Sequence, residues 1–399
     1  MELQESSKNK APIEIISGIK NYNKAVPVVI AFFLILVTAC SPVKSTQSPS
    51  VFPNITDEVT TSPMTPTQPT VTPTFQVPTV TSIPPGTKIV VIDTDMAMDD
   101  WMAILYLLQR PDIIIQAITV TGTGEAHCES GVKNALGLVA LAGNNPIPVA
   151  CGRETPLQGD HVFPENWRAS VDSVFGINLP TGNNPSEFND ANDLLLSVIQ
   201  GSQQKVTLLT LGPLTTIAEL VQTTPSIIEN LETIYVMGGA VDVAGNIATS
   251  GVPINNRVAE WNIYIDPVAA NIVFKSGAPI TMVGLDATNH TPLKREFYDR
   301  VKENHLTPEA EFLLKIYDTN QWYFDSNQMY FWDQVTSVVL TDESFSTFEP
   351  RSICVVEEEG TQSGRTKSEA NCPEIRVAFS IDREKFESLF LGTLNLQTP

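Results

Sequence analysis

The sequence predicts an α/β fold: a mainly parallel, open sheet with helices on both faces. Short apolar runs rich in β-branched residues alternate with longer stretches of helical character, which is typical of parallel sheets. Strands are expected at residues 88–92, 113–121, 146–151, 206–211, 233–237 and 279–285. Helices are expected at residues 101–109, 129–142, 190–200, 214–222, 267–276, 307–320 and 335–340.

The first strand and helix are the clearest of these elements. Residues 88–92 are short and apolar, as a buried parallel strand should be, and residues 101–109 are rich in leucine and end before Pro111. Later strands end at glycines, in Gly212-Pro213 and in Gly238-Gly239. The Gly-, Pro- and Asn-rich segment 152–185 is expected to be a long surface loop beside the carboxyl edge of the sheet.

The N-terminal 39 residues have the layout of a secretory signal. The apolar run 25–39 is too short to span a bilayer comfortably and ends in small residues before Cys40, which resembles a bacterial lipobox. Four lysines precede the run: Lys8, Lys10, Lys20 and Lys24. We expect residues 1–39 to be a lipoprotein signal peptide, Cys40 to be lipidated, and the exported protein to be anchored to a bacterial cell membrane. An uncleaved signal anchor is the alternative.

Residues 40–87 are dominated by Thr, Pro and Ser and predict a disordered tether, which leaves residues 88–399 as the catalytic domain. The net charge of −21 argues against nucleic acid as a partner. Four cysteines remain in the domain, and a disulfide between Cys354 and Cys372 would close a polar hairpin. Pairing of Cys128 with Cys151 stays open.

Four carboxylates follow the first strand within eight residues: Asp93, Asp95, Asp99 and Asp100. The carboxyl end of a strand in an open α/β sheet is where ligands bind, and like charges this close repel unless a cation or protons compensate. The alternative is that one Asp caps the following helix and the others are solvated. Capping needs one carboxylate and not four, so the cluster predicts a metal site.

Other strand ends supply further polar groups. The turn after Leu211 leaves its carbonyl directed into the crevice without a ladder partner, and hard cations accept such oxygens. Glu260 and Asn262 are expected to alternate onto one side of an extended segment, where a carboxylate and an amide suit paired hydroxyls. Asp333 follows three aromatic residues, the last of which is Trp332.

These motifs together resemble the inosine/uridine-preferring nucleoside hydrolase family. The matching segments are Asp93-Thr-Asp95 with Asp99-Asp100, Leu211-Gly-Pro-Leu-Thr215, Met237-Gly-Gly239, Glu260-Trp-Asn262 with Asp266-Pro267, and Trp332-Asp333. The resemblance covers nearly all of residues 88–340 and implies the nucleoside hydrolase (Rossmann-like) fold with one Ca²⁺. It implies Asp95, Asp100, the Leu211 carbonyl and Asp333 as the metal ligands. It implies that ribose hydroxyls are held by Asp99, Asn246, Glu260 and Asn262, and that Met237 lines the pocket.

The expected activity is calcium-dependent hydrolysis of the N-glycosidic bond of ribonucleosides, giving ribose and free base. A water bound to the cation becomes a usable nucleophile when a carboxylate takes its proton, and Asp95 is the expected base. Glu260 and Asp99 would stabilise the oxocarbenium-like state electrostatically. The sequence leaves the preferred base open, and it is compatible with a homo-oligomer.

Three departures from the family pattern bear on this prediction. Met96-Ala97 stands where many members have Pro-Gly, Gly124 and Glu125 stand where an Asn is common, and Trp332 stands where some members have a His. Trp332 could stack on a base, with a core aromatic as the alternative.

Two other functions compete with nucleoside hydrolysis. One is a tethered lipoprotein that binds nucleosides or pentoses, with Ca²⁺, but turns them over poorly. The missing His and the altered loop at Met96-Ala97 motivate it. The other is a phosphatase of the haloacid dehalogenase type, in which an Asp-x-Asp also follows a strand. That class expects Thr or Val at the position of Ala97 and leaves Asp99-Asp100 unexplained.

Overall fold

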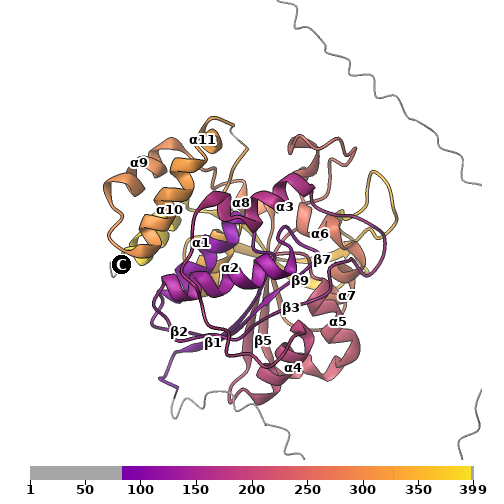
Figure 1. Ribbon diagram of the computed structural model, residues 1–399. Coiled ribbons are helices and arrows are strands. Elements are labelled where there is room, and N and C mark those ends of the chain that lie inside the picture. The colour runs from indigo at the N-terminus through magenta and orange to yellow at the C-terminus, as the bar shows by residue number, and fades with distance from the viewer. Residues whose placement is uncertain (1–82, 327, 397–399) are drawn as a thin grey trace, which may run out of the picture. The chain divides into compact units, whose positions relative to one another are not determined.

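The structure is a computed structural model that describes residues 83–326 and 328–396 (Figure 1). The predicted signal peptide, Cys40 and residues 41–82 of the predicted tether lie outside the described residues. Across the described part of the chain, every helix is too short or too polar to cross a bilayer.

The described residues form a nine-stranded sheet in the order β3-β2-β1-β4-β5-β6-β9-β7-β8. Neighbouring strands from β3 to β9 in this order pair in parallel, while β7 pairs antiparallel with both β9 and β8. The strands are β1 Lys88–Thr94, β2 Ile113–Val120, β3 Val149–Cys151, β4 Val206–Thr210, β5 Leu231–Met237, β6 Ile280–Val283, β7 Ser346–Val355, β8 Thr366–Ser368 and β9 Glu374–Ile381. The prediction of a mainly parallel open sheet is confirmed.

Helices fill most of the connections between strands. The α-helices are α1 Met98–Leu108, α2 Cys128–Leu141, α3 Glu165–Asp172, α4 Ala191–Gly201, α5 Thr215–Thr223, α6 Trp261–Ile265, α7 Pro267–Phe274, α8 Leu285–Thr288, α9 Arg295–Glu303, α10 Pro308–Thr319, α11 Trp322–Ser326, α12 Asp333–Thr341 and α13 Arg383–Leu394. Short 3₁₀ helices are η1 Val174–Gly176, η2 Pro225–Asn230 and η3 Ile247–Thr249.

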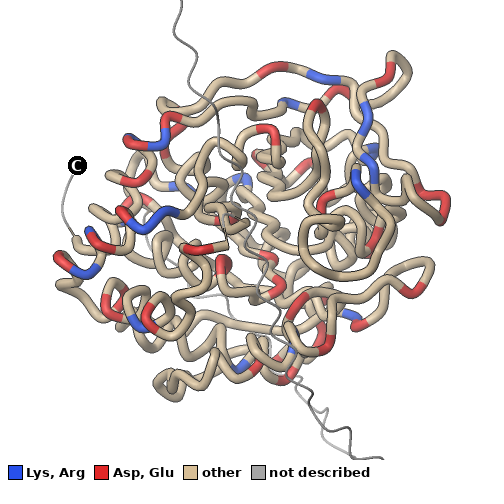
Figure 2. The backbone as a smooth tube through the Cα atoms, turned by 90° about the horizontal axis from the view of Figure 1, so that it is seen from above, with Lys and Arg blue, Asp and Glu red and all other residues tan. Residues whose placement is uncertain are grey.

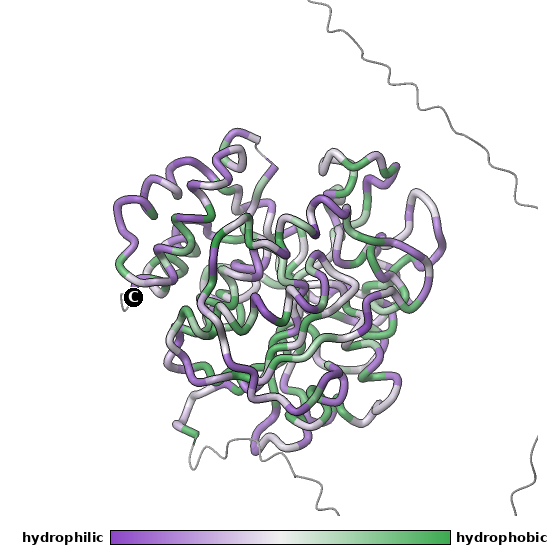
Figure 3. The backbone as a smooth tube through the Cα atoms, in the orientation of Figure 1, coloured by the Kyte–Doolittle hydropathy of each residue, from purple (hydrophilic) through white to green (hydrophobic). Residues whose placement is uncertain are grey.

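The sheet is buried on both faces, as a parallel sheet must be. Successive side chains of β1 point to opposite sides: Val90 and Ile92 pack in the core that includes α1, α2, α12 and α13, whereas Ile89 and Val91 pack in the core of α4, α5 and α7. In Figure 1 the helices α1 and α2 lie on one side of the strands, and α4, α5 and α7 lie on the other. Figure 3 shows hydrophobic segments running through the middle of the domain, where the strands lie.

The strand order reverses at β1. The chain runs outward from β1 through β2 to β3 and then returns to β4, which pairs with the other side of β1. In open α/β sheets such a reversal opens a crevice beyond the carboxyl ends of the two central strands, because their connections leave in opposite directions. Asp95 and Leu211, which directly follow β1 and β4, stand at this crevice.

Two predicted elements are wrong. Segment 152–185, expected to be loop, contains α3 and η1, and α3 is held in place by Asn134 of α2, whose Nδ2 donates to the carbonyls of Val171 and Asp172 at 3.2 and 3.1 Å. The segment around Glu260 is not extended: Glu260 is the N-cap of α6. Such tertiary contacts override a local composition that favours loop or extended chain.

The cysteines of the domain form two disulfides, Cys128–Cys151 and Cys354–Cys372. The first joins the start of α2 to the end of β3, close to the carboxyl edge of the sheet. The second closes the excursion between β7 and β9 that carries β8.

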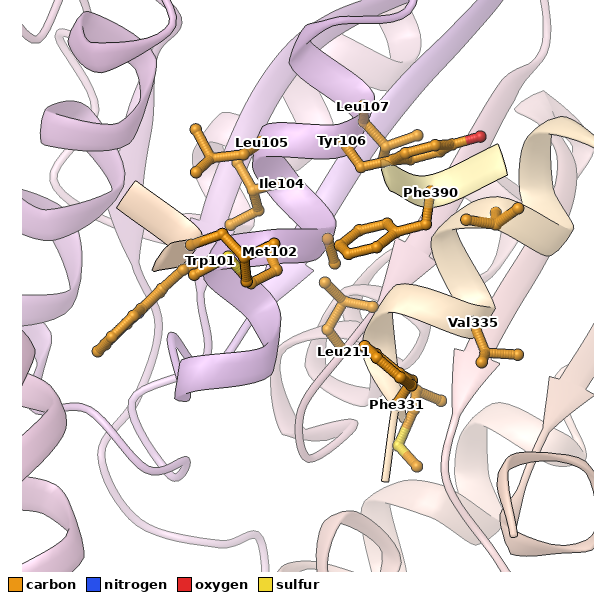
Figure 4. Close-up of a cluster of buried hydrophobic side chains, with 14 of the residues drawn as sticks. Trp101, Met102, Ile104, Leu105, Tyr106, Leu107, Leu211, Phe331, Val335 and Phe390 are labelled. Carbon is orange, nitrogen blue, oxygen red and sulfur yellow. The ribbon is translucent and has the colours of Figure 1, made fainter. Parts of the chain in front are cut away.

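The C-terminal helix α13 completes the core on the α1 face of the sheet. Phe390 is fully buried, and its ring centroid lies 5.9 Å from that of Tyr106 in α1 and 6.2 Å from that of Phe331 (Figure 4). Phe386, one turn earlier, packs on the same aromatic cluster. The residues after α12 are therefore part of the folded domain rather than an appendage.

Replacing Phe390 with Ala should lower the free energy of unfolding by about 3–5 kcal/mol, because it leaves a cavity among packed aromatic rings. Urea denaturation followed by circular dichroism measures this change. Ser388→Ala, on the exposed side of the same helix, is the matched control and should stay within about 0.5 kcal/mol of wild type. Equal stabilities for the two variants would contradict the packing of α13.

Candidate active site

A cavity of about 520 Å³ opens at the carboxyl edge of the sheet. Its size suits a small organic ligand. The residues predicted for the site converge on it: Asp95, Asp99, Asp100, Leu211, Met237, Asn246, Glu260, Asn262, Trp332 and Asp333. Figure 2, which views the molecule from above, shows several acidic segments near the middle.

Asp93 is not among the residues that line the cavity. It is fully buried inside β1, and its Oδ1 accepts a hydrogen bond of 2.6 Å from Thr119 of β2. Burial raises the pKa of Asp93 to about 8. The side chain therefore ties two central strands together below the cavity, which fits a supporting position.

Backbone groups from three loops enclose Asp95. Its Oδ1 accepts from the N–H of Ala97 at 3.3 Å, and its Oδ2 accepts from the N–H of Glu125 at 3.2 Å. A Cβ atom at Gly124 or Gly212 would lie 2.0 or 2.5 Å from the Cβ of Asp95, so only glycine allows these loops to approach so closely. The carboxylate is held in one orientation by its surroundings.

The loop after Asp95 follows a strained path. Met96 has φ of 57°, in the left-handed region that a side chain with a Cβ disfavours, and its own side chain is fully buried. Met96 donates its N–H to Thr94 Oγ1 at 3.0 Å, which holds the turn. The departure from Pro-Gly at positions 96 and 97 thus leaves the backbone able to deliver Asp99 and Asp100 to the cavity.

Three carboxylates form a compact group. One oxygen each from Asp99, Asp100 and Asp333 lies within 4.8 Å of the others. Asp95 stands beside this group, because its N–H donates to Asp100 Oδ1 at 3.2 Å. Asp100 Oδ2 and Asp333 Oδ1 are buried and have no hydrogen-bond partner among the described residues. Buried, unpaired oxygens of this kind are what a hard cation would satisfy.

Burial and mutual repulsion raise the carboxyl pKa values throughout the site. Burial raises the pKa of Asp99 to about 7, with the charge of Asp95 adding to the effect. Burial likewise raises the pKa of Glu260 to about 7, although three backbone N–H groups oppose it. The pKa values of Asp100 and Asp333 are raised well above the ordinary value, first by burial and then by neighbouring carboxylates. So many carboxylates can be ionised together only where positive charge compensates them.

Glu260 and Asn262 are fixed by the start of α6. Glu260 Oε1 accepts from the Asn262 N–H at 2.9 Å, and its Oε2 accepts from the N–H of Gly239 at 3.1 Å. Asn262 Nδ2 donates to the carbonyl of Leu211 at 3.0 Å, so that carbonyl, expected to be free, has a side-chain partner. A helical N-cap therefore brings together the two side chains that we expected from an extended segment.

Asn246, Met237 and Trp332 complete the predicted set. Asn246 Oδ1 accepts from the Trp261 N–H at 3.2 Å, and Met237 receives Asn262 Nδ2 at both its carbonyl and its sulfur. Trp332 directly precedes Asp333 and the start of α12, and its indole N–H is buried without a hydrogen-bond partner in the described chain.

Sequence reasoning missed much of the cavity wall. Glu125 lines the cavity, and burial followed by the charges of Asp95 and Asp99 raises its pKa well above the ordinary value. Glu125 follows β2 as Asp95 follows β1, so the same strand-end argument could have found it. The missed aromatic lining residues are Phe163, Trp167, Phe175, Trp261, Trp322 and Tyr323. Several of these lie in or beside α3 and α11, neither of which the sequence predicted.

Fold and site together define an α/β protein with an acidic cavity at the carboxyl edge of a mainly parallel sheet. The chain belongs to the inosine-uridine preferring nucleoside hydrolase family, whose sequence model matches residues 90–388.

Individual relatives agree with this assignment. The chain is 31% identical over 317 residues to the pyrimidine-specific ribonucleoside hydrolase RihA of Klebsiella pneumoniae, covering 76% of this chain and 97% of the relative. It is 37% identical over 216 residues to RihA of Shewanella oneidensis, covering 53% of this chain and 64% of the relative. A solved plant nucleoside hydrolase superposes with a TM-score of 0.68 at 27% identity, over 77% of this chain and 99% of that one. A purine-preferring ribonucleoside hydrolase from Gardnerella vaginalis superposes with a TM-score of 0.65 at 26% identity, over 78% and 99%.

The raised pKa values predict how stability depends on pH when cations are removed by a chelator. In the unfolded chain Asp99 and Glu260 ionise near pH 4, whereas in the fold both hold a proton until about pH 7. The contribution of these two carboxyl groups to the stability of the fold is fully present below about pH 4 and is lost as pH rises through about 7. The melting temperature should therefore fall between pH 5 and pH 8.

Asp99→Asn removes one of these ionisable groups and is the control for this pH dependence. Between pH 5 and pH 8, in the same chelator, the melting temperature of Asp99→Asn should fall by less than that of wild type. A fall as steep as that of wild type would show that the Asp99 carboxyl does not titrate as described.

Proposed function

We propose that the chain hydrolyses the N-glycosidic bond of ribonucleosides with the help of one Ca²⁺, releasing ribose and the free base. The observation that carries this proposal is the compact group of Asp99, Asp100 and Asp333 beside Asp95, which has buried oxygens without a hydrogen-bond partner in the described part of the chain. Family membership supports hydrolysis of nucleosides as the reaction, and the carboxylates could bind the cation and accept the proton.

The donor set suits Ca²⁺. All candidate ligands are oxygens, they come from separate segments, and Ca²⁺ accepts such irregular oxygen shells. Asp95, Asp100, Asp333 and the Leu211 carbonyl would hold the ion. The Leu211 carbonyl oxygen has a second lone pair for the ion beside the one that accepts from Asn262 Nδ2. Asp99, whose carboxylate belongs to the compact group, would stand between the ion and the sugar. When bound, the cation orients the ribose diol and makes a water molecule more acidic.

Asp95 is the proposed general base. Its two oxygens are oriented by backbone N–H groups, and its pKa is raised by burial, so it has more affinity for a proton than an exposed Asp. A base that is buried, oriented and next to the other ligands can take the proton from a water molecule attacking the anomeric carbon. The bond that breaks is the one between this carbon and the nitrogen of the base.

The ribose hydroxyls would bind to Asp99, Asn246, Glu260 and Asn262, which line the cavity together. Positive charge develops on the sugar as the base departs, and carboxylates already fixed in a water-poor cavity stabilise that charge without having to reorganise. Glu260 suits this role because three backbone N–H groups hold its carboxylate.

The leaving base would lie against Met237 and Trp332. Trp332 supplies an aromatic face for stacking but cannot act as a strong acid. This favours substrates whose base departs readily. Because Trp332 cannot protonate the base, a nucleoside-binding protein with little turnover is the second candidate function.

The N-terminal features extend the proposal to location. We propose that residues 1–39 are a lipoprotein signal peptide, that Cys40 carries the lipid, and that residues 40–87 connect it to the domain at 88–399. The sequence pattern of lysines, apolar run and small residues before Cys40 supports export and lipid anchoring to a bacterial membrane. Mass spectrometry of the mature N-terminus tests it.

Turnover of inosine, uridine and p-nitrophenyl riboside with added calcium tests the activity. Wild type should cleave at least the activated riboside, and Asp95→Ala should lower turnover of each cleaved substrate by about a thousandfold or more, because it loses base and ligand together. Binding of all three ribosides without cleavage would establish the binding-protein alternative instead. Substantial turnover by calcium-loaded Asp95→Ala would contradict the assigned mechanism.

Asp333→Ala should release calcium, because it removes one oxygen from the buried group and leaves the others too few to offset desolvation of the ion. Elemental analysis after gel filtration measures the bound metal. Asp112→Ala, which removes a carboxylate from an ion pair with Arg110 away from the cavity, should keep it. Equal calcium content in the two variants would remove Asp333 from the shell.

A further inference from the structure

We propose that Arg168 is a positioning residue for Asp95, acting by clamping the loop 122–126 against it. This inference rests on the proposed function: its activity readout rests on turnover of ribosides, and its calcium readout rests only on the proposed metal site. Arg168 lies in α3, within the segment whose composition predicts a loop, and it is not among the residues that line the cavity.

Arg168 is a buried cation on an anchored helix. Its exposed fraction is 6%, which is unusual for arginine unless its charge and donors are used. The helix is fixed at its C-terminal end: Asp172 accepts from the backbone N–H of His127 at 2.9 Å and lies 2.7 Å from the Nδ1 of that residue. Arg168 therefore presents its guanidinium from a defined position.

The guanidinium contacts both ends of one loop. Its Nη2 donates to the carbonyls of Gly122 and Ala126, each at 3.3 Å. These residues bracket the turn that follows β2, and a planar donor group that engages two carbonyls fixes their separation. Removing the side chain would leave both buried carbonyls without this partner.

The clamped loop makes three contacts with Asp95. The N–H of Glu125 donates to Asp95 Oδ2 at 3.2 Å, and the N–H of Ala126 donates to the Asp95 carbonyl at 2.9 Å. The third contact is at Gly124, whose missing side chain lets the loop touch the Cβ of Asp95. A shift of the loop would thus move the oxygen that is proposed to accept the proton.

Arg168 also places positive charge near carboxylates. Burial raises the pKa values of Asp95 and Glu125, and the guanidinium charge opposes that rise at both. Loss of the guanidinium charge and loss of the clamp should change calcium affinity in opposite directions. Losing a nearby positive charge strengthens cation binding, whereas losing the orientation of a ligand weakens it. Calcium affinity therefore separates the two roles.

The test compares Arg168→Met, Arg168→Lys and Arg153→Met with wild type. Met keeps the length of the stem without the donors, and Lys restores a charged donor. Arg153 is the matched control, because it pairs with Glu219 and does not line the cavity. Arg168→Met should lower kcat by about 30-fold or more while KM changes by less than about threefold, since misplacing a reacting group costs rate more than binding. Arg168→Lys should regain part of the loss, and Arg153→Met should match wild type.

Calcium titration by calorimetry is the second measurement. Arg168→Met should bind calcium about tenfold more weakly than wild type, as loss of an outer-shell partner typically does. Unchanged or tighter binding would overturn the clamp. A kcat of Arg168→Met within twofold of wild type would also overturn it. So would a fall in kcat accompanied by an equal rise in KM that Arg168→Lys does not reverse. If wild type cleaves no riboside, the proposed function fails, and the calcium titration alone decides the role of Arg168.

Discussion

The site depends on keeping several largely buried carboxylates close together at one edge of the sheet. Without compensation their charges repel and their burial is costly, as the raised pKa values of Asp99, Asp100 and Asp333 show. The protein offsets part of this through backbone N–H groups, which hold Asp95 and Glu260. The proposed divalent cation would supply the remaining compensation, because Asp100 Oδ2 and Asp333 Oδ1 are buried without a hydrogen-bond partner among the described residues.

The sheet makes that crowding achievable. Carboxyl ends of β1, β4 and β5 lie side by side, so residues far apart in sequence reach one cavity from rigid strands. Close approach then depends on what is missing: the glycines around Asp95 have no Cβ to keep the loops apart. The strands and the glycines next to Asp95 together determine where the carboxylates lie.

Much of this could be predicted from sequence, because strand ends and acidic residues are local signals. The parallel sheet follows from alternating runs, and Asp95, Asp99 and Asp100 follow from their place after β1. The aromatic wall and α3 could not be predicted in this way, because Asn134 and neighbouring elements stabilise α3 through tertiary contacts that no local pattern contains. Glu260 shows a third case, in which the right residue was found with the wrong backbone, since N-cap geometry and extended chain both place a carboxylate before a polar neighbour.

The described chain enters the domain at the start of β1, whereas the cavity lies beyond its end. Seven extended residues separate these edges, about 23 Å of strand. The described chain thus begins near the amino edge of the sheet, whereas the cavity lies at the carboxyl edge. A chemical tag on Lys88, the first residue of β1, would therefore sit seven strand residues away from the cavity, which makes this edge a suitable handle for binding measurements.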